Sequence, residues 1–138
     1  EDYEIISYNG HSGLGANLDL DGMNIRLKEV NASKLQFKKN YQIIFFNGCS
    51  TYSYYNRKYF KAKGGSQNLE TILTGLPSYY SDMPGNNKAF LGPFSNFDLI
   101  SYPELVSDIE KTNLTTGTTL LFVNGEQDNP RNPAEFKK

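Results

Sequence analysis

The chain contains one cysteine and one histidine, and each follows a short apolar segment that ends in Asn-Gly. Cys49 follows residues 43–48 (IIFFNG), and His11 follows residues 5–10 (IISYNG). A short apolar run that stops at glycine is typical of a buried strand leading into a tight turn. A thiolate is a nucleophile, and a nearby imidazole can activate the thiol or protonate a leaving amine. We therefore expect Cys49 to be a catalytic nucleophile and His11 its general base or acid.

Acyl transfer by such a pair also requires N–H donors for the oxyanion that forms on the substrate. The backbone N–H of Cys49 and those of Ser12 and Gly13 belong to the same two turns as the cysteine and the histidine. The glycines around His11 allow the backbone to come close to a ligand. We expect Ser12, Gly13 and Cys49 to supply the oxyanion donors, provided that the two turns meet.

Four short apolar segments bounded by turn residues are predicted to be strands. They are residues 3–8, 41–46, 69–74 and 118–123. The long connections between them favour crossovers, and hence a mostly parallel sheet with helices on its faces. Ligands bind such sheets outside the carboxyl ends of the strands, which is where His11 and Cys49 fall. The sequence therefore predicts one α/β domain over residues 1–138.

The first two connections are less clearly patterned. Residues 18–27 alternate apolar and polar side chains around Asp21-Gly22, which fits a hairpin or an irregular crossover. Residues 31–40 are polar and basic, and we expect a connector or a short helix there. The tyrosine-rich segment 52–60 is expected to be a helix or an ordered loop that ends at Gly64-Gly65.

The later connections contain strong turn and helix signals. Pro84-Gly85 and Gly92-Pro93 predict a loop over residues 81–94. A helix is predicted to begin after Ser101, with this serine as the N-cap and Glu104 completing a capping box. The proline-rich C-terminal tail is expected to lie at the surface.

Composition excludes several classes of function. The net charge is -1, with 14 basic and 15 acidic residues, which gives no reason to expect nucleic acid as a partner. No apolar run approaches the roughly 20 residues that a membrane-spanning helix needs. A single cysteine excludes an internal disulfide and a cysteine-rich zinc site. The abundance of Tyr, Asn, Ser and Gly is compatible with a secreted or cell-envelope bacterial protein.

The two strand-end blocks resemble those of the caspase-like, or clan CD, cysteine peptidases, which include caspases, legumains, gingipains, separases and CHAT domains. That family pairs a strand ending in His-Gly with a later strand ending in a small residue and Cys. Here the blocks are IISYNGHSG (5–13) and IIFFNGC (43–49), with Gly48 as the small residue and Ser12 where the family has glycine. The resemblance implies a caspase-like three-layer α/β sandwich and a cysteine endopeptidase, a hydrolase with a Cys49–His11 catalytic dyad and no cofactor.

The resemblance also bears on partners and on the substrate cleft. The family fold has strands before the histidine strand, so this chain would be the C-terminal part of a longer chain or a trimmed relative. It would then associate with a missing N-terminal segment or form a homodimer, and it would act on a peptide or protein substrate. The candidates for lining the cleft are Asn47, Gly48, Tyr52 and Gly75. The acidic candidates for setting its specificity, among which the sequence does not choose, are Glu70, Asp82 and Asp98.

Two other motifs were weighed. The segment Asn17-x-Asp19-x-Asp21-Gly22 matches the first half of an EF-hand loop, but Lys28 stands where the loop needs a bidentate Glu. We therefore expect no metal site, with Asp19 and Asp21 as the only candidates for a weak calcium site. A serine hydrolase built on Ser12 is disfavoured because no histidine follows it in the chain.

Two functions from different classes remain open at this point. The first is a cysteine peptidase that uses the Cys49–His11 dyad. The second is a non-catalytic domain of the same fold that serves protein binding or assembly, in which Cys49 is inert and a partner covers an exposed sheet edge.

Overall fold

The structure is a computed structural model that describes residues 3–30, 37, 39–113 and 120–125. A four-stranded sheet with the order β1-β2-β3-β4 lies at its centre. The strands are β1 (Ile5–Asn9), β2 (Gln42–Asn47), β3 (Leu69–Thr74) and β4 (Leu121–Asn124). The first three strands are parallel, and β4 is antiparallel to β3. The sequence prediction of an α/β fold with a mostly parallel sheet is therefore confirmed.

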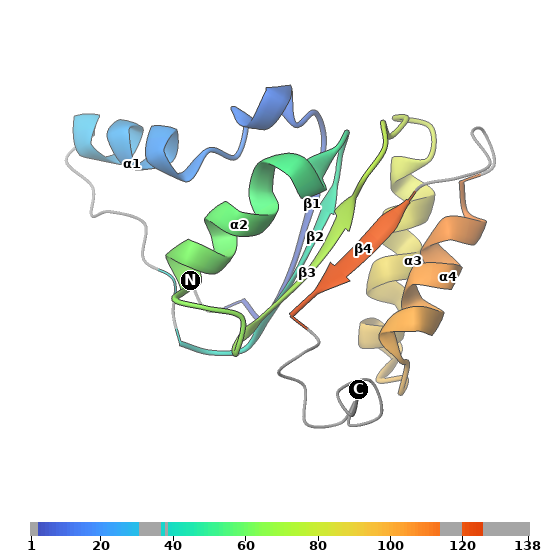
Figure 1. The fold of residues 1–138 in the computed structure, drawn as a ribbon. Coiled ribbons are helices and arrows are strands. Elements are labelled where there is room, and N and C mark those ends of the chain that lie inside the picture. Colours follow the sequence, from blue (N-terminus) through green and yellow to red (C-terminus); the bar gives the residue numbers. More distant parts are fainter. Residues whose placement is uncertain (1–2, 31–36, 38, 114–119, 126–138) are drawn as a thin grey trace, which may run out of the picture.

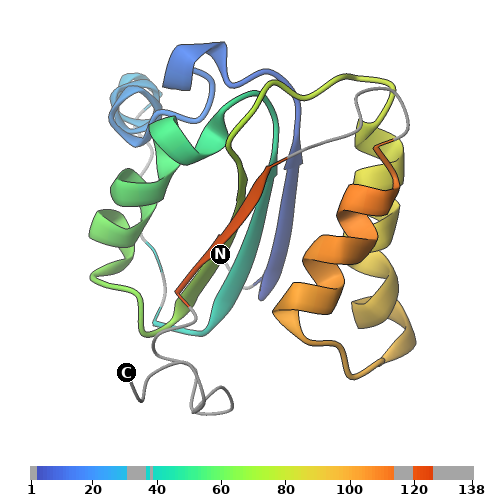
Figure 2. The same ribbon diagram turned by 45° about the vertical axis from the view of Figure 1, so that its right-hand side comes forward.

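Helices cover both faces of the sheet, which gives three layers (Figures 1 and 2). On one face lie α1 (Leu20–Glu29) and α2 (Thr51–Lys63). On the other face lie α3 (Met83–Asn96) and α4 (Tyr102–Lys111). A short 3-10 turn, η1 (Gly13–Gly15), follows β1. No helix in the described part of the chain is long and apolar enough to span a bilayer.

The core is divided by the sheet into two apolar clusters, because successive side chains of a strand point to opposite faces. In β2, Phe46 packs with Tyr55 of α2 on one side, while Phe45 packs with Phe90 of α3 on the other. All six residues of β2 and all six of β3 are buried. Such uninterrupted burial is expected for central strands covered on both faces.

The register aligns the carboxyl ends of the parallel strands. Asn9 of β1 pairs with Asn47 of β2, and Phe46 pairs with Leu73 of β3. The chain therefore leaves β1, β2 and β3 at the same edge of the sheet, next to the start of β4. The loops that carry His11 and Cys49 emerge there, as predicted.

Several local predictions are confirmed. The tyrosine-rich segment forms α2 and ends at Gly64, whose φ of 88° lies in the left-handed region that favours glycine. The capping box at α4 is present, since the Ser101 side chain accepts from the N–H of Glu104 and Glu104 accepts from that of Ser101. Residues 118–119, most of 31–40 and most of the C-terminal tail lie outside the described residues.

The hairpin or irregular crossover expected over residues 18–27 is wrong, because this segment contains most of α1. Asp19 caps the helix, and its carboxylate accepts a hydrogen bond from the N–H of Gly22 at 2.9 Å. Leu20 is buried and Met23 packs against the same cluster, so the apolar residues that matter follow a helical spacing. Of the side chains whose alternation suggested strands, Leu20 is buried, Leu18 and Leu27 are half-buried and Ile25 is exposed.

The loop predicted over residues 81–94 is also wrong, because α3 occupies most of it. Pro84 lies in the first turn, where a helix does not need its N–H, and therefore starts the helix rather than breaking it. Pro93 falls in the last turn of the helix, which is followed by the C-cap residue Phe97 with a φ of 59°. Burial of Phe90 against Phe45 outweighs the low helix propensity of the two Pro-Gly pairs.

Candidate active site at the carboxyl ends of the parallel strands

The turns that follow β1 and β2 are in direct contact. The N–H of Gly10 donates a hydrogen bond to the carbonyl oxygen of Asn47 at 3.1 Å. A Cβ atom at Gly48 would lie 2.4 Å from the carbonyl oxygen of Gly10, so a side chain there would push the two turns apart. The glycine that precedes Cys49 is therefore what allows the histidine turn to approach it.

Cys49 is a partly exposed free thiol at the entrance to α2. Its Sγ lies 3.4 Å from both the carbonyl oxygen and the backbone nitrogen of Ser78. The thiol can thus donate to the Ser78 carbonyl, while the Ser78 N–H donates to the sulfur. The N-terminal end of a helix, such as α2 just beyond Cys49, carries partial positive charge, which favours an anion nearby.

The peptide bond between Gly48 and Cys49 is fixed in one orientation. The carbonyl oxygen of Gly48 accepts hydrogen bonds from the hydroxyl groups of Thr74 and Ser78, the latter at 3.1 Å. In a trans peptide the N–H points away from the carbonyl, so the N–H of Cys49 is directed away from this network. Among the described residues it has no hydrogen-bond acceptor. This is the arrangement required of an oxyanion donor.

His11 is held through its backbone rather than its ring. The hydroxyl of Tyr8 and the side-chain amide of Asn17 both donate to the His11 carbonyl, at 2.6 Å and 2.7 Å. The ring itself is exposed and contacts the ring of Tyr80 edge-on, with centroids 4.8 Å apart. The backbone that carries the imidazole is therefore held in place, and the ring is exposed.

The predicted oxyanion residues Ser12 and Gly13 follow in a constrained turn. Ser12 is buried, and its carbonyl accepts from the Tyr55 hydroxyl at 2.8 Å and from the N–H of Gly15 at 2.9 Å. Gly13 has a φ of 57°, which suits glycine. Burial raises the pKa of Tyr55, so its hydroxyl keeps the proton that it donates to Ser12. The Ser12–Gly13 backbone is thus anchored to α2.

Cys49 and His11 are linked by the segment that connects β3 to α3. Ser78 contacts the cysteine sulfur, and Tyr80, two residues later, contacts the histidine ring. No direct hydrogen bond joins the two side chains within the described part of the chain. Sequence reasoning missed Ser78, Tyr80 and Thr74, although the third parallel strand must end at the same edge as the first two.

The four cleft candidates have different roles. Asn47 is buried, and its amide donates to Asn9 at 2.8 Å and to the Met83 carbonyl at 3.2 Å. It therefore holds β1, β2 and α3 together and does not line an open cleft. Gly48 provides the contact with the histidine turn. Tyr52 is partly exposed and stacks against Phe122 at 4.5 Å. Gly75 packs under Phe122 and Leu120.

The two calcium candidates, Asp19 and Asp21, both lie at the N-terminal end of α1. Asp19 caps α1 and pairs with Lys58, whose hydrogen bond holds the pKa of the Asp19 carboxyl below its ordinary value. Asp21 lies in the first turn of α1. The described residues contain no group of three His, Cys, Asp or Glu side chains arranged to hold a metal ion.

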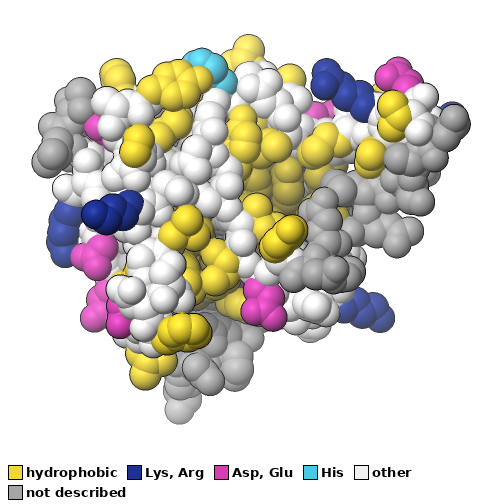
Figure 3. All heavy atoms as spheres, turned by 180° about the vertical axis from the view of Figure 1, so that it is seen from behind, with side chains coloured by type: hydrophobic (Ala, Val, Ile, Leu, Met, Phe, Trp, Pro, Cys, Tyr) yellow, Lys and Arg dark blue, Asp and Glu magenta, His cyan; other side chains and the backbone are white. Residues whose placement is uncertain are grey.

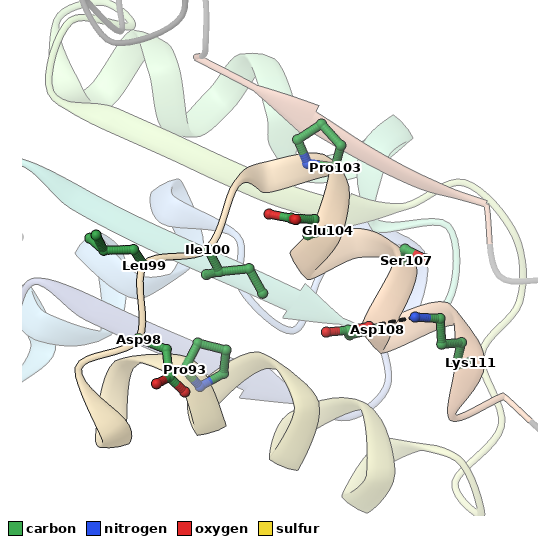
Figure 4. A pocket seen from close by; sticks show the side chains of 9 residues that line it. All are labelled: Pro93, Asp98, Leu99, Ile100, Pro103, Glu104, Ser107, Asp108 and Lys111. Atoms are coloured by element: carbon green, nitrogen blue, oxygen red, sulfur yellow. Dashed lines mark hydrogen bonds and ion pairs between the residues drawn. The ribbon is translucent and has the colours of Figure 1, made fainter.

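Two surface pockets are lined by neither Cys49 nor His11. One, of about 600 Å³, is formed by α4 and the end of α3 (Figure 4), and Asp98 and Glu104 are among its lining residues. The other, of about 530 Å³, lies between η1, the start of α1 and α2. The acidic candidate Glu70 is buried in β3.

Comparisons with protein-family models, with curated proteins and with solved structures found no match to this chain.

Proposed function

We propose that the chain is a cysteine peptidase, or the catalytic part of one, in which Cys49 attacks the peptide bond and His11 transfers the proton. The observation that carries the proposal is the contact between the two turns, in which the Gly10 N–H binds the Asn47 carbonyl and Gly10 packs on Gly48. It holds the turns that carry the single Cys and the single His next to each other, at the carboxyl edge of the parallel strands, where such sheets commonly bind ligands. This arrangement supports the resemblance to caspase-like peptidases.

The reaction would proceed by acyl transfer. The Cys49 thiol loses its proton to His11, and the sulfur attacks the carbonyl carbon of the scissile bond. The carbonyl π electrons move to oxygen and give a tetrahedral oxyanion. As it collapses, the C–N bond breaks, the amine takes the proton from His11, and a thioester remains on Cys49. Water, deprotonated by His11, hydrolyses the thioester and restores the thiol.

The oxyanion would be bound by backbone N–H groups. The Cys49 N–H is directed away from the Gly48 carbonyl and has no acceptor among the described residues. A second donor would come from Ser12 or Gly13, whose turn is anchored by Tyr55. Donors fixed in advance stabilise the transition state without having to reorganise during the reaction.

Cleavage of a peptide library, followed by mass spectrometry, tests the proposal. Wild type should cut peptides, whereas Cys49→Ala and His11→Ala should not, although both should fold. Cys49→Ala should fold because the sulfur makes hydrogen bonds only with the Ser78 backbone among the described residues. Leu99→Ser, at a 98% exposed position between α3 and α4, serves as the control and should keep full activity. Cleavage that persists in Cys49→Ala, or is absent in wild type, contradicts the proposal.

A second candidate function is favoured by the position of β1. This strand lies at one edge of the sheet and pairs only with β2 among the described residues. An open edge strand invites pairing with another strand. A binding or assembly domain would use this edge, with Cys49 inert. A monomeric state across concentrations in light scattering, together with Cys49-dependent cleavage, would exclude this alternative.

A further inference from the structure

The three turns around Cys49 and His11 carry no acidic or basic side chain other than His11 itself. Residues 10–17, 47–53 and 75–80 contain no Asp, Glu, Lys or Arg. The same holds for residues 120–122, which lead into and begin β4 at this edge. The chain has 29 residues of these four types, so their absence from all of these segments indicates that the site is not built to bind a charged group.

Three charged groups on neighbouring elements are already engaged. Asp82, which follows the third turn, is only 6% exposed, and its carboxylate accepts from the Ser81 hydroxyl. Asp19 and Lys58, beyond the first turn, pair with each other. A charged substrate side chain buried here would find no opposite charge, which is costly. The acidic specificity candidates Glu70 and Asp98 lie elsewhere, one in the core and the other beside α4.

Large apolar side chains, in contrast, are concentrated and exposed around the site. Those on the three turns and at the start of β4 are Leu14, Tyr52, Leu76, Tyr79, Tyr80 and Leu120. The Leu76 carbonyl binds the N–H of Ser50, so this residue lies directly beside the nucleophile. Figure 3 shows hydrophobic side chains next to the cyan side chain of His11.

Leu14 adds a second, independent observation. It lies three residues after His11, is 85% exposed and has a φ of 54°. A leucine in the left-handed region is strained. Because the side chain is exposed, burial of apolar surface does not offset this strain. Strained positions of this kind cluster at active sites and ligand-binding segments.

We infer that the site accepts a peptide with a large uncharged side chain, aliphatic or aromatic, next to the bond that is cut. Leu76 and the exposed tyrosines of the third turn form the surface that contacts this side chain. The inference rests on the proposed function, because it takes Cys49 as the reacting atom. Its test is nevertheless independent of whether His11 assists.

The test uses peptidyl chloromethyl ketones Ala-Ala-X with X as Phe, Leu, Asp or Lys. The sulfur of Cys49 displaces chloride from the methylene carbon and forms a C–S bond. Because the chain has one cysteine, intact-mass spectrometry reports this reaction, and Cys49→Ala measures labelling elsewhere. We expect the Phe and Leu probes to react about tenfold faster than the Asp and Lys probes, after each rate is normalised to free thiol reactivity.

Leu76→Ser should reduce the preference for Leu and Phe severalfold, whereas the matched Leu99→Ser should leave it unchanged. Equal rates for all four probes, or a faster Asp or Lys probe, would overturn the inference. The dyad of the proposed function is tested separately by His11→Ala. If this variant reacts with all four probes at the wild-type rates, the dyad is contradicted, whatever the side-chain preference. Thermal unfolding of both serine variants verifies that each preference is measured on folded protein.

Discussion

The side-chain amide of Asn47 donates a hydrogen bond to the side-chain oxygen of Asn9 at 2.8 Å, one residue before each of the Gly-containing turns. Asn47 also donates to the Met83 carbonyl and accepts from Asn86, so the pair is tied to α3 as well. The strands that lead to Cys49 and His11 are therefore fixed relative to each other by a polar network centred on the buried Asn47, in addition to the β-ladder.

Asn47→Ala should lower both stability and Cys49 reactivity. The substitution removes the acceptor of the buried Asn86 amide N–H and a donor to the Met83 carbonyl, which costs about 2–3 kcal/mol. Urea unfolding measures the stability, and peptide cleavage well below the melting temperature measures the effect on the folded site. The exposed Asn96→Ala at the end of α3 is the matched control and should change stability by less than about 0.5 kcal/mol. An active, fully stable Asn47→Ala protein would contradict the supporting role.

Gly48→Ala tests the contact between the two turns. The new methyl group would lie 2.4 Å from the Gly10 carbonyl oxygen, so we expect a loss of about 1–3 kcal/mol and strongly reduced cleavage. Gly92→Ala is the comparison, since a Cβ atom there meets nothing within 4 Å and the residue lies in α3. That variant should gain about 0.5–1 kcal/mol because alanine favours a helix. Equal activity of the two variants would show that the turns need not touch.

Tyr55 gives a prediction about pH. Burial raises the pKa of this phenol, so the folded state holds its proton when the unfolded chain begins to lose it near pH 10. Its stabilising effect is fully present below that pH and is lost as the pH rises through the higher folded pKa. Tyr55→Phe should cost about 1 kcal/mol at neutral pH, through the lost bond to Ser12.

The difference in stability between wild type and Tyr55→Phe should therefore shrink above pH 10, as followed by urea unfolding at several pH values. Tyr3→Phe, at a 72% exposed position, should follow wild type throughout. A difference between wild type and Tyr55→Phe that stays constant up to pH 11 would show that Tyr55 titrates like an ordinary tyrosine.

The sequence predicted the sheet because its strands are short apolar runs with clear stops, and all four were located. The placement of His11 and Cys49 at one edge followed from parallel pairing alone. The helices were predicted less well, because Pro84 and Gly85 are turn signals unless they fall in a first helical turn, as they do in α3. Whether a helix forms here depends on the packing of Phe90 against Phe45. This contact joins distant parts of the chain, so the local sequence pattern does not reveal it.

The third turn of the site was missed for a related reason. Ser78 contacts the cysteine sulfur through its backbone and the Gly48 carbonyl through its hydroxyl, and Tyr80 contacts the His11 ring. These are supporting contacts, which the residue type alone does not reveal. The buried role of Asn47 was missed because its partners Asn86 and Met83 lie in a segment that was expected to be a loop. In both cases the information lies in tertiary contacts between distant parts of the chain.

The rate at which iodoacetamide alkylates Cys49 in wild type and in His11→Ala tests the central claim most directly. The single cysteine makes the reaction measurable by mass, and Tyr80→Ala serves as a control that removes the ring contact with His11 but keeps the imidazole. The account predicts that alkylation near neutral pH is at least about tenfold slower in His11→Ala, because the imidazole promotes thiolate formation. An alkylation rate that is the same in both proteins would mean that His11 does not act on Cys49, and would contradict the dyad.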